Sequence, residues 1–115
     1  MNDFVLIFRS ESRVEVKLTT EGLATMSKEW ENWMGGVAAQ NKLVSPGKRL
    51  GFEGRTVKPG NIVTNGPYAE IKEMIAGLTI IRADSIEEAA EMAKSCPILN
   101  IGGNVEVRDI IPMNG

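Results

Sequence analysis

The feature that most constrains the fold is a strand, a capped helix and a second strand in the C-terminal third of the chain. Residues 77–83 are rich in β-branched side chains, which favour a strand. Ser85 and Glu88 then have the spacing of a capping box, so a helix is expected to begin there. Pro97 ends it, because proline disfavours helical geometry at the preceding residue. This helix is expected to bury an apolar face made of Ile86, Ala89, Ala90 and Ala93.

Strand-like segments lie at both ends of the chain. Residues 3–9 are apolar on both faces, as expected of a strand in the middle of a sheet. Residues 104–111 alternate instead, and place Val105 and Val107 on one face and Glu106 and Arg108 on the other. The sequence therefore predicts a central first strand and a half-exposed last strand.

A long amphipathic helix is predicted from Thr20 to about Gln40. Thr20 is a plausible N-cap, and Gly35-Gly36 within the helix each cost about 1 kcal/mol relative to alanine. Steps of three and four residues indicate one apolar face. That face is formed by Leu23, Met26, Trp30, Trp33, Met34 and Val37.

The middle of the chain is rich in turn signals. Pro46-Gly47 predicts a turn within a connection over residues 41–47, and Pro59-Gly60 predicts a reversal between two short extended pieces. The short extended pieces are expected at residues 49–52, 56–58 and 61–64. Residues 10–19 fit a short edge strand or a loop equally well.

The order strand, helix, extended region, strand, helix, strand predicts one α+β domain over residues 1–115. Two right-handed crossovers give a ferredoxin-like split βαβ fold, with a four-stranded antiparallel sheet and two helices on one face. The other face of the sheet would then be bare. A bare apolar face is the physical reason to expect a homodimer.

Composition excludes several function classes. The chain has no histidine and one cysteine, so a Cys/His zinc site, a histidine-based triad and an internal disulfide are all excluded. A net charge of −2 without a basic stripe makes nucleic acid an unexpected partner. The apolar run at residues 4–8 is too short for a signal peptide or membrane span. We expect a cytoplasmic protein without metal or cofactor.

The segment 64–77 carries the candidate site residues. Asn65, with Gly66-Pro67, forms a turn signal that turn chemistry alone explains. Tyr68 could offer its hydroxyl to a cleft or be a buried aromatic with its hydroxyl at the rim. Glu70 could act as a base or ligand contact, or join Lys72 in an ion network with Glu73.

Two further residues have both a functional and a structural reading. Arg108 could bind an anion, as could Arg9, but the sequence favours a structural pair with Glu106 or Asp109 for these arginines. Cys96 is expected to be a small buried hydrophobe rather than a nucleophile.

Several of these motifs resemble the YCII-related family, and specifically its DGPF-type branch. The resemblance rests on Asn65-Gly66-Pro67-Tyr68-Ala69-Glu70, on Lys72-Glu73 with Gly77, on the capped helix with Pro97, and on 103–108. It implies a protomer that pairs sheet to sheet in a dimeric α+β barrel. Some relatives have a proposed histidine–aspartate dyad, which this chain lacks. Asn65 also stands where the signature has aspartate.

Three functions remain open from the sequence. The first is a homodimer that binds a small molecule at the sheet–sheet cleft, through Asn65, Tyr68, Glu70, Lys72 and Arg108. The second is a cofactor-independent enzyme that uses Glu70 and Tyr68 for acid–base chemistry. The third is a purely structural or regulatory dimer.

Overall fold

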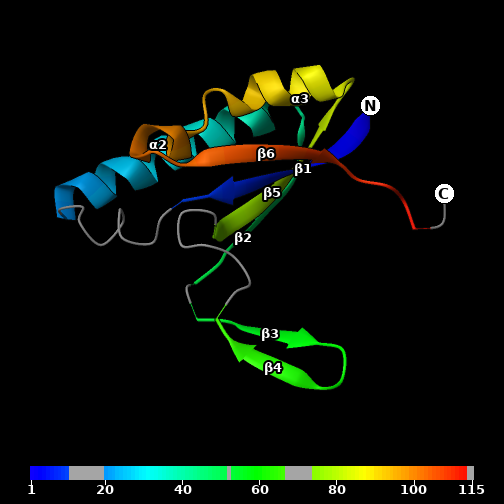
Figure 1. The fold of residues 1–115 in the computed structure, drawn as a ribbon. Coiled ribbons are helices and arrows are strands. Elements are labelled where there is room, and N and C mark those ends of the chain that lie inside the picture. Colours follow the sequence, from blue (N-terminus) through cyan, green and yellow to red (C-terminus); the bar gives the residue numbers. More distant parts are fainter. Residues whose placement is uncertain (11–19, 52, 67–73, 114–115) are drawn as a thin grey trace.

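Two strand–helix–strand units and a β-hairpin make up the part of the chain that the computed structural model describes, residues 1–10, 20–51, 53–66 and 74–113 (Figure 1). The elements in chain order are β1 (Asn2–Arg9), α2 (Thr20–Ala39), β2 (Leu43–Arg49), β3 (Arg55–Lys58), β4 (Ile62–Asn65), β5 (Ile75–Ala83), α3 (Ile86–Ala93), the 3₁₀-helix η2 (Pro97–Ile101) and β6 (Asn104–Asp109).

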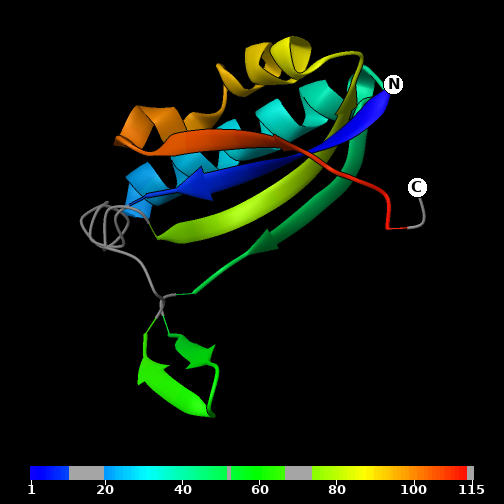
Figure 2. The ribbon, with the colours of Figure 1, turned by 45° about the vertical axis from the view of Figure 1, so that its right-hand side comes forward.

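The main sheet has the order β2-β5-β1-β6, and each neighbouring pair is antiparallel. Both helices cover the same face of this sheet (Figures 1 and 2). The predicted ferredoxin-like fold is therefore confirmed, and so is the central position of β1. Pairing of two such sheets in a dimeric barrel stays a prediction.

The core lies between the sheet and the helices. Phe4, Leu6 and Phe8 of β1 point to the helix-covered face and are buried, while Val5 and Ile7 alternate onto the opposite, open face. On the covered face they join the following core residues of the other elements: Trp33, Val37, Ile81, Ala83, Ala89, Ala93, Cys96 and Ile98.

Strand β2 corrects the sequence prediction for residues 41–47. Pro46-Gly47 does not end a connection but lies inside a strand, where the pairing with β5 shifts register on both sides of it. Gly47 has φ of +74°, and a Cβ there would lie 1.7 Å from the Leu78 carbonyl oxygen. A glycine in a bulge and a glycine in a turn need the same left-handed backbone, so Pro46-Gly47 alone cannot distinguish the two.

The hairpin β3–β4 confirms the reversal predicted at Pro59-Gly60. Its strands pair antiparallel from Arg55↔Asn65 to Lys58↔Ile62, and Gly60 and Asn61 both have positive φ. The hairpin extends away from the main sheet, beyond the β2 edge and on the side remote from the helices (Figures 1 and 2).

Helix α3 starts as predicted. The Ser85 hydroxyl accepts the backbone N–H of Glu88 at 3.1 Å. The Glu88 carboxylate accepts a hydrogen bond from the Lys42 ammonium at 2.5 Å, which lowers the pKa of Glu88. Ala89 and Ala93 are buried, but Ile86 and Ala90, which were expected on the buried face, are exposed. The helix is only eight residues long, so its buried face is narrow.

The last strand is two residues shorter than predicted, and a 3₁₀-helix precedes it. Pro97 starts this 3₁₀-helix, and Gly102, with φ of +83°, ends it. Val105 and Val107 lie on the helix-covered face of β6 and Glu106 on the open face, as the alternation predicted.

Candidate functional site

The residues predicted to bind a ligand do not come together in the described structure. Asn65 is exposed at the end of β4 in the hairpin, and Arg108 is exposed on β6, at the far edge of the main sheet (Figure 1). Tyr68, Glu70 and Lys72 lie outside the described residues.

Asn65 and Gly66 have the geometry of a structural turn. The Gly66 N–H donates to the Gly54 carbonyl at 2.8 Å, and the Gly66 carbonyl accepts the Thr56 hydroxyl at 3.0 Å. The left-handed residue is Gly66, with φ of +80°, whereas Asn65 is the last residue of its strand. The conformational freedom of asparagine is therefore not what this turn requires.

Arg108 and Arg9 share one acidic partner on the open face of the sheet. Arg9 Nη2 donates to Glu106 Oε1 at 2.9 Å, and Arg108 Nε lies 3.9 Å from Glu106 Oε2. Both arginines therefore pair with Glu106, one of the two acidic partners that the sequence predicts. Arg108 is the more exposed of the two, so its ion pair contributes little to stability.

A cavity of about 420 Å³ lies between α2, over Leu23 to Met34, and the β2–β5 edge of the sheet, and we call it the helix–sheet cavity. It has the size and the mainly apolar lining of a small-molecule site. Its walls are formed by Phe8, Leu23, Met26, Ser27, Trp30, Glu31, Met34, Pro46, Lys48, Arg49, Ala76, Gly77, Leu78, Thr79 and Ile98.

The sequence explains why this space stays open. Leu23, Met26, Trp30 and Met34 belong to the apolar face of α2, but none of them is fully buried. Across the cavity, Gly77 leaves β5 without a side chain, and its Cα lies so close to β2 that a Cβ would be 2.7 Å from the Lys48 carbonyl oxygen. The large side chains of α2 thus face a position in β5 that carries no side chain.

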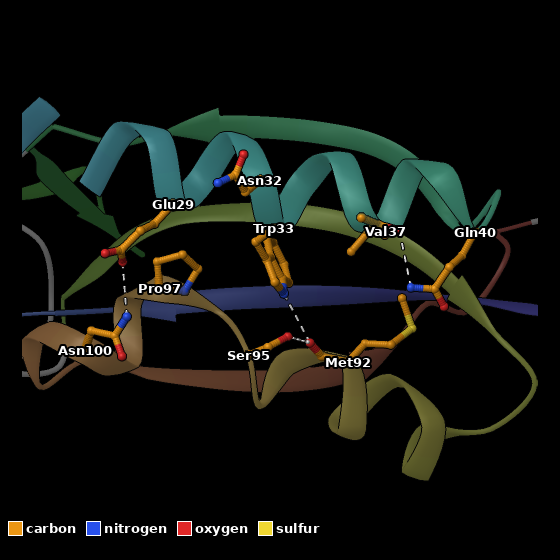
Figure 3. A pocket seen from close by; sticks show the side chains of 10 residues that line it. Glu29, Asn32, Trp33, Val37, Gln40, Met92, Ser95, Pro97 and Asn100 are labelled. Atoms are coloured by element: carbon orange, nitrogen blue, oxygen red, sulfur yellow. Dashed lines mark hydrogen bonds between the residues drawn. The ribbon is translucent and has the colours of Figure 1, made fainter. Parts of the chain in front are cut away.

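A second hollow, the interhelical groove, lies between α2 and the α3–η2 segment and has a volume of about 520 Å³ (Figure 3). Two side-chain hydrogen bonds cross this groove. Trp33 Nε1 donates to the Met92 carbonyl at 3.2 Å, and Asn100 Nδ2 donates to Glu29 Oε2 at 3.2 Å. These bonds connect α2 to the α3–η2 segment, so we interpret the groove as part of the scaffold.

Cys96 is buried, as predicted. Burial raises the pKa of its thiol from 9.0 to about 11, so the thiol is neutral and inert at neutral pH. Within the described parts of the chain, no group of cysteine, aspartate and glutamate side chains is placed to hold a metal ion. No described helix is long and apolar enough to cross a membrane.

Reasoning from the sequence missed the helix–sheet cavity. Trp30 was predicted to seat α2 on the sheet, and its ring does pack edge to face on Phe8, with centroids 5.1 Å apart. Lys48 and Arg49 follow Pro46-Gly47, which has the composition of a turn, so the sequence does not mark them as cavity residues. Two adjacent cations after a glycine were the available signal, but strand β2 can be placed only by its pairing with β5.

Comparison with known proteins places the chain in a family and adds little on function. The family model for the YCII-related domain matches residues 5–114. No curated protein matches significantly. One solved structure is 5-chloro-2-hydroxyhydroquinone dehydrochlorinase (TftG) from Burkholderia phenoliruptrix AC1100, in complex with 2,5-dihydroxybenzoquinone. It shares 15% identity over 96% of both chains with a TM-score of 0.48, a likeness too distant to inform ligand or activity.

Proposed function

This chain belongs to the YCII-related family, and we propose that it is a homodimer that binds a small molecule in the helix–sheet cavity. The cavity carries the proposal, because about 420 Å³ lined by aromatic, methionine and leucine side chains has the size and apolar character of a small-molecule site. A bound apolar ligand would recover the contacts that these side chains lack.

The homodimer is supported by the open face of the sheet. Val5 lies opposite Ile80 and Ile7 opposite Leu78, so four apolar side chains form a continuous stripe. No described helix covers them (Figures 1 and 2). Apolar surface of this kind is typical of a protein–protein contact. Sheet-to-sheet pairing, as in the dimeric barrel expected for the DGPF-type branch, would bury the stripe.

The candidate residues Tyr68, Glu70 and Lys72 remain part of this proposal. Their segment enters β5 through Met74, two residues before Ala76 in the cavity wall. This short distance along the chain supports a role beside the cavity. A cleft between the two sheets is the other place where these residues could meet a ligand.

Blocking the cavity tests the ligand site. Ser27 is exposed and lines the cavity, so Ser27→Phe adds bulk there at little cost to folding. Binding of naphthalene-1-carboxamide and octanamide, two uncharged apolar probes, is measured by titration calorimetry. We expect at least one to bind the native protein and to lose at least tenfold in affinity in Ser27→Phe. Ala38→Phe, on an exposed part of the same helix outside both hollows, is the control and should bind normally.

Breaking the dimer separates the two possible ligand sites. Ile7→Asp places a charge in the apolar stripe and should give a monomer by light scattering at micromolar concentration, while Ala38→Asp stays dimeric. A folded Ile7→Asp monomer that still binds the probe supports the helix–sheet cavity. A monomer that binds nothing moves the site to the sheet–sheet cleft, and a native protein that is already monomeric overturns the dimer.

A further inference from the structure

We infer that the β3–β4 hairpin is an arm that packs against the second protomer of the homodimer through two valines, Val57 and Val63. This inference rests on the proposed function, because it names a part of the partner contact that the main sheet does not supply. Three observations carry it: the weak support of the hairpin within the described chain, the apolar residues that it exposes, and its position beside the open face of the sheet.

The hairpin has little support from the described parts of its own chain. It forms a separate two-stranded sheet, and the main sheet is complete without it. The hydrogen bonds of its threonines are internal. Thr56 donates to the Gly66 carbonyl at 3.0 Å, and Thr64 donates to the Thr56 carbonyl at 3.5 Å. A two-stranded hairpin alone is at best marginally stable in water and needs a further strand or a packed face. A partner protomer would supply that packed face.

The hairpin exposes its apolar side chains instead of burying them. Val57 and Val63 are opposite each other in the register, so their side chains lie side by side on one face. They are 71% and 59% exposed, and Ile62 is 54% exposed. Threonine favours a strand as valine does, and the neighbouring pair in the hairpin is Thr56 and Thr64. Strand formation alone therefore does not require the two valines, whereas an apolar contact does.

The hairpin lies on the side where the second protomer is expected. It projects beyond the β2 edge on the side remote from both helices, which is the side of the apolar stripe (Figures 1 and 2). The radius of gyration is 15.6 Å, against about 13 Å for a compact domain of 115 residues, so the chain is extended for its length. A protomer that covers the stripe would stand beside the projecting hairpin.

The small area of the apolar stripe is the reason to expect a further contact. Each partner contributes about 800 Å² to a stable interface. The four side chains of the stripe are partly buried by their neighbours, so they expose only a fraction of that area. Charged residues border them, since Lys48 lies opposite Leu78 and Glu106 opposite Ile7, and interface centres are poor in charge. The two valines add apolar area on the same side, and a two-fold axis provides this contact twice.

A conservative double substitution tests the arm. Val57→Thr with Val63→Thr keeps the branched side chains and the preference for a strand, but removes the apolar contact. The dimer dissociation constant, measured by sedimentation velocity over a dilution series, should rise about tenfold or more, because the two-fold axis repeats each change. Ile86→Thr with Leu99→Thr is the control, since these residues of α3 and η2 are 45% and 42% exposed. The control should dimerise normally, and thermal melts check that both variants are folded.

Hydrogen exchange shows whether the partner holds the hairpin. The amides of residues 55–58 and 62–65 are followed by mass spectrometry in the native dimer and in the Ile7→Asp monomer. Pairing within the hairpin involves no other strand, so exchange should be about tenfold or more slower in the dimer only if the partner covers it. Native protein diluted below its dissociation constant repeats the comparison without a substitution. The amides of β1 and β5 are the internal reference and should stay protected in each sample.

The outcomes separate the inference from the proposed function. If Ile7→Asp gives a monomer but the double threonine variant dimerises normally, the arm is wrong and the homodimer stands. Equal exchange of the hairpin in dimer and monomer would have the same meaning. Equal weakening by the control pair would also overturn the arm, because the effect would not belong to the hairpin. A native protein that is monomeric throughout the dilution series overturns both the homodimer and the arm.

Discussion

The two halves of helix α2 have the same apolar spacing and very different surroundings. In the C-terminal half, Trp33 and Val37 are 8% and 4% exposed and join the core. In the N-terminal half, Leu23 is 42% exposed and Met26 is only half-buried, and both line the helix–sheet cavity. One continuous helix is therefore scaffold at one end and a cavity wall at the other.

The difference has a physical origin in what each half faces. The C-terminal half is bonded to α3, because the Trp33 indole donates to the Met92 carbonyl. The same ring packs against Phe8 of β1. The N-terminal half faces the bulged strand β2 and the bare backbone at Gly77. Periodicity determines which side of a helix is apolar, whereas the neighbour decides how closely that side is packed.

The largest expected effect comes from the β2 bulge at Gly47, next to Pro46 in the cavity wall. Gly47→Ala would place a Cβ 1.7 Å from the Leu78 carbonyl oxygen in a left-handed backbone. We expect a loss of more than about 4 kcal/mol in the free energy of unfolding, or no folded protein, by urea denaturation. Gly60→Ala is the control, since Gly60 is also left-handed but has open space around it, and should cost about 1–2 kcal/mol. Similar costs for both variants would contradict the bulge geometry.

A direct comparison of the two halves of α2 comes next. Trp33→Ala removes a buried ring and its hydrogen bond and should cost about 3–5 kcal/mol in urea denaturation. Leu23→Ala removes a half-exposed side chain from the cavity rim and should cost less than about 1 kcal/mol. If Leu23→Ala cost as much as Trp33→Ala, the N-terminal half would be packed in solution and the cavity closed.

An effect smaller than the loss of Trp33 is the pH dependence that the buried Cys96 adds to the stability of the core. Its folded-state pKa is raised from 9.0 to about 11, so the stability it contributes is complete below pH 9 and is lost as pH rises towards 11. The loss at pH 11 should be about 2 kcal/mol. Because tyrosine and lysine titrate in the same range, the measurement is the difference between the native protein and Cys96→Ala in urea denaturation from pH 8 to 11. Parallel pH profiles would show that this part of the core admits water.

Much of the fold could be predicted from the sequence because its signals are local. The capping serine at Ser85 and the alternation along β6 each depend on neighbours within a few residues, whereas α3 ends at Ala93, before the Pro97 that was expected to end it. Strand β2 could not be predicted in the same way, since Pro46-Gly47 has the composition of a turn and becomes a bulge only against Leu78.

The candidate site was less predictable than the fold. Asn65 and Arg108 were selected by motif and charge, and the structure places them on separate elements with structural partners nearby. Lys48 and Arg49 had no motif of their own to mark them. A pocket is made of residues distant in sequence, so local patterns cannot show that Arg49, Trp30 and Gly77 share one.

By itself, the sequence determined the order of the two helices and of the strands β1, β5 and β6, the apolar faces of α2 and β6, and the absence of histidine chemistry. Only the tertiary structure decided that β2 completes the sheet around a glycine bulge and that a cavity lies between α2 and the β2–β5 edge. The reason is that periodicity and capping are energies between near neighbours along the chain. The width of the space under α2 depends instead on contacts between residues that the chain brings together only when it folds.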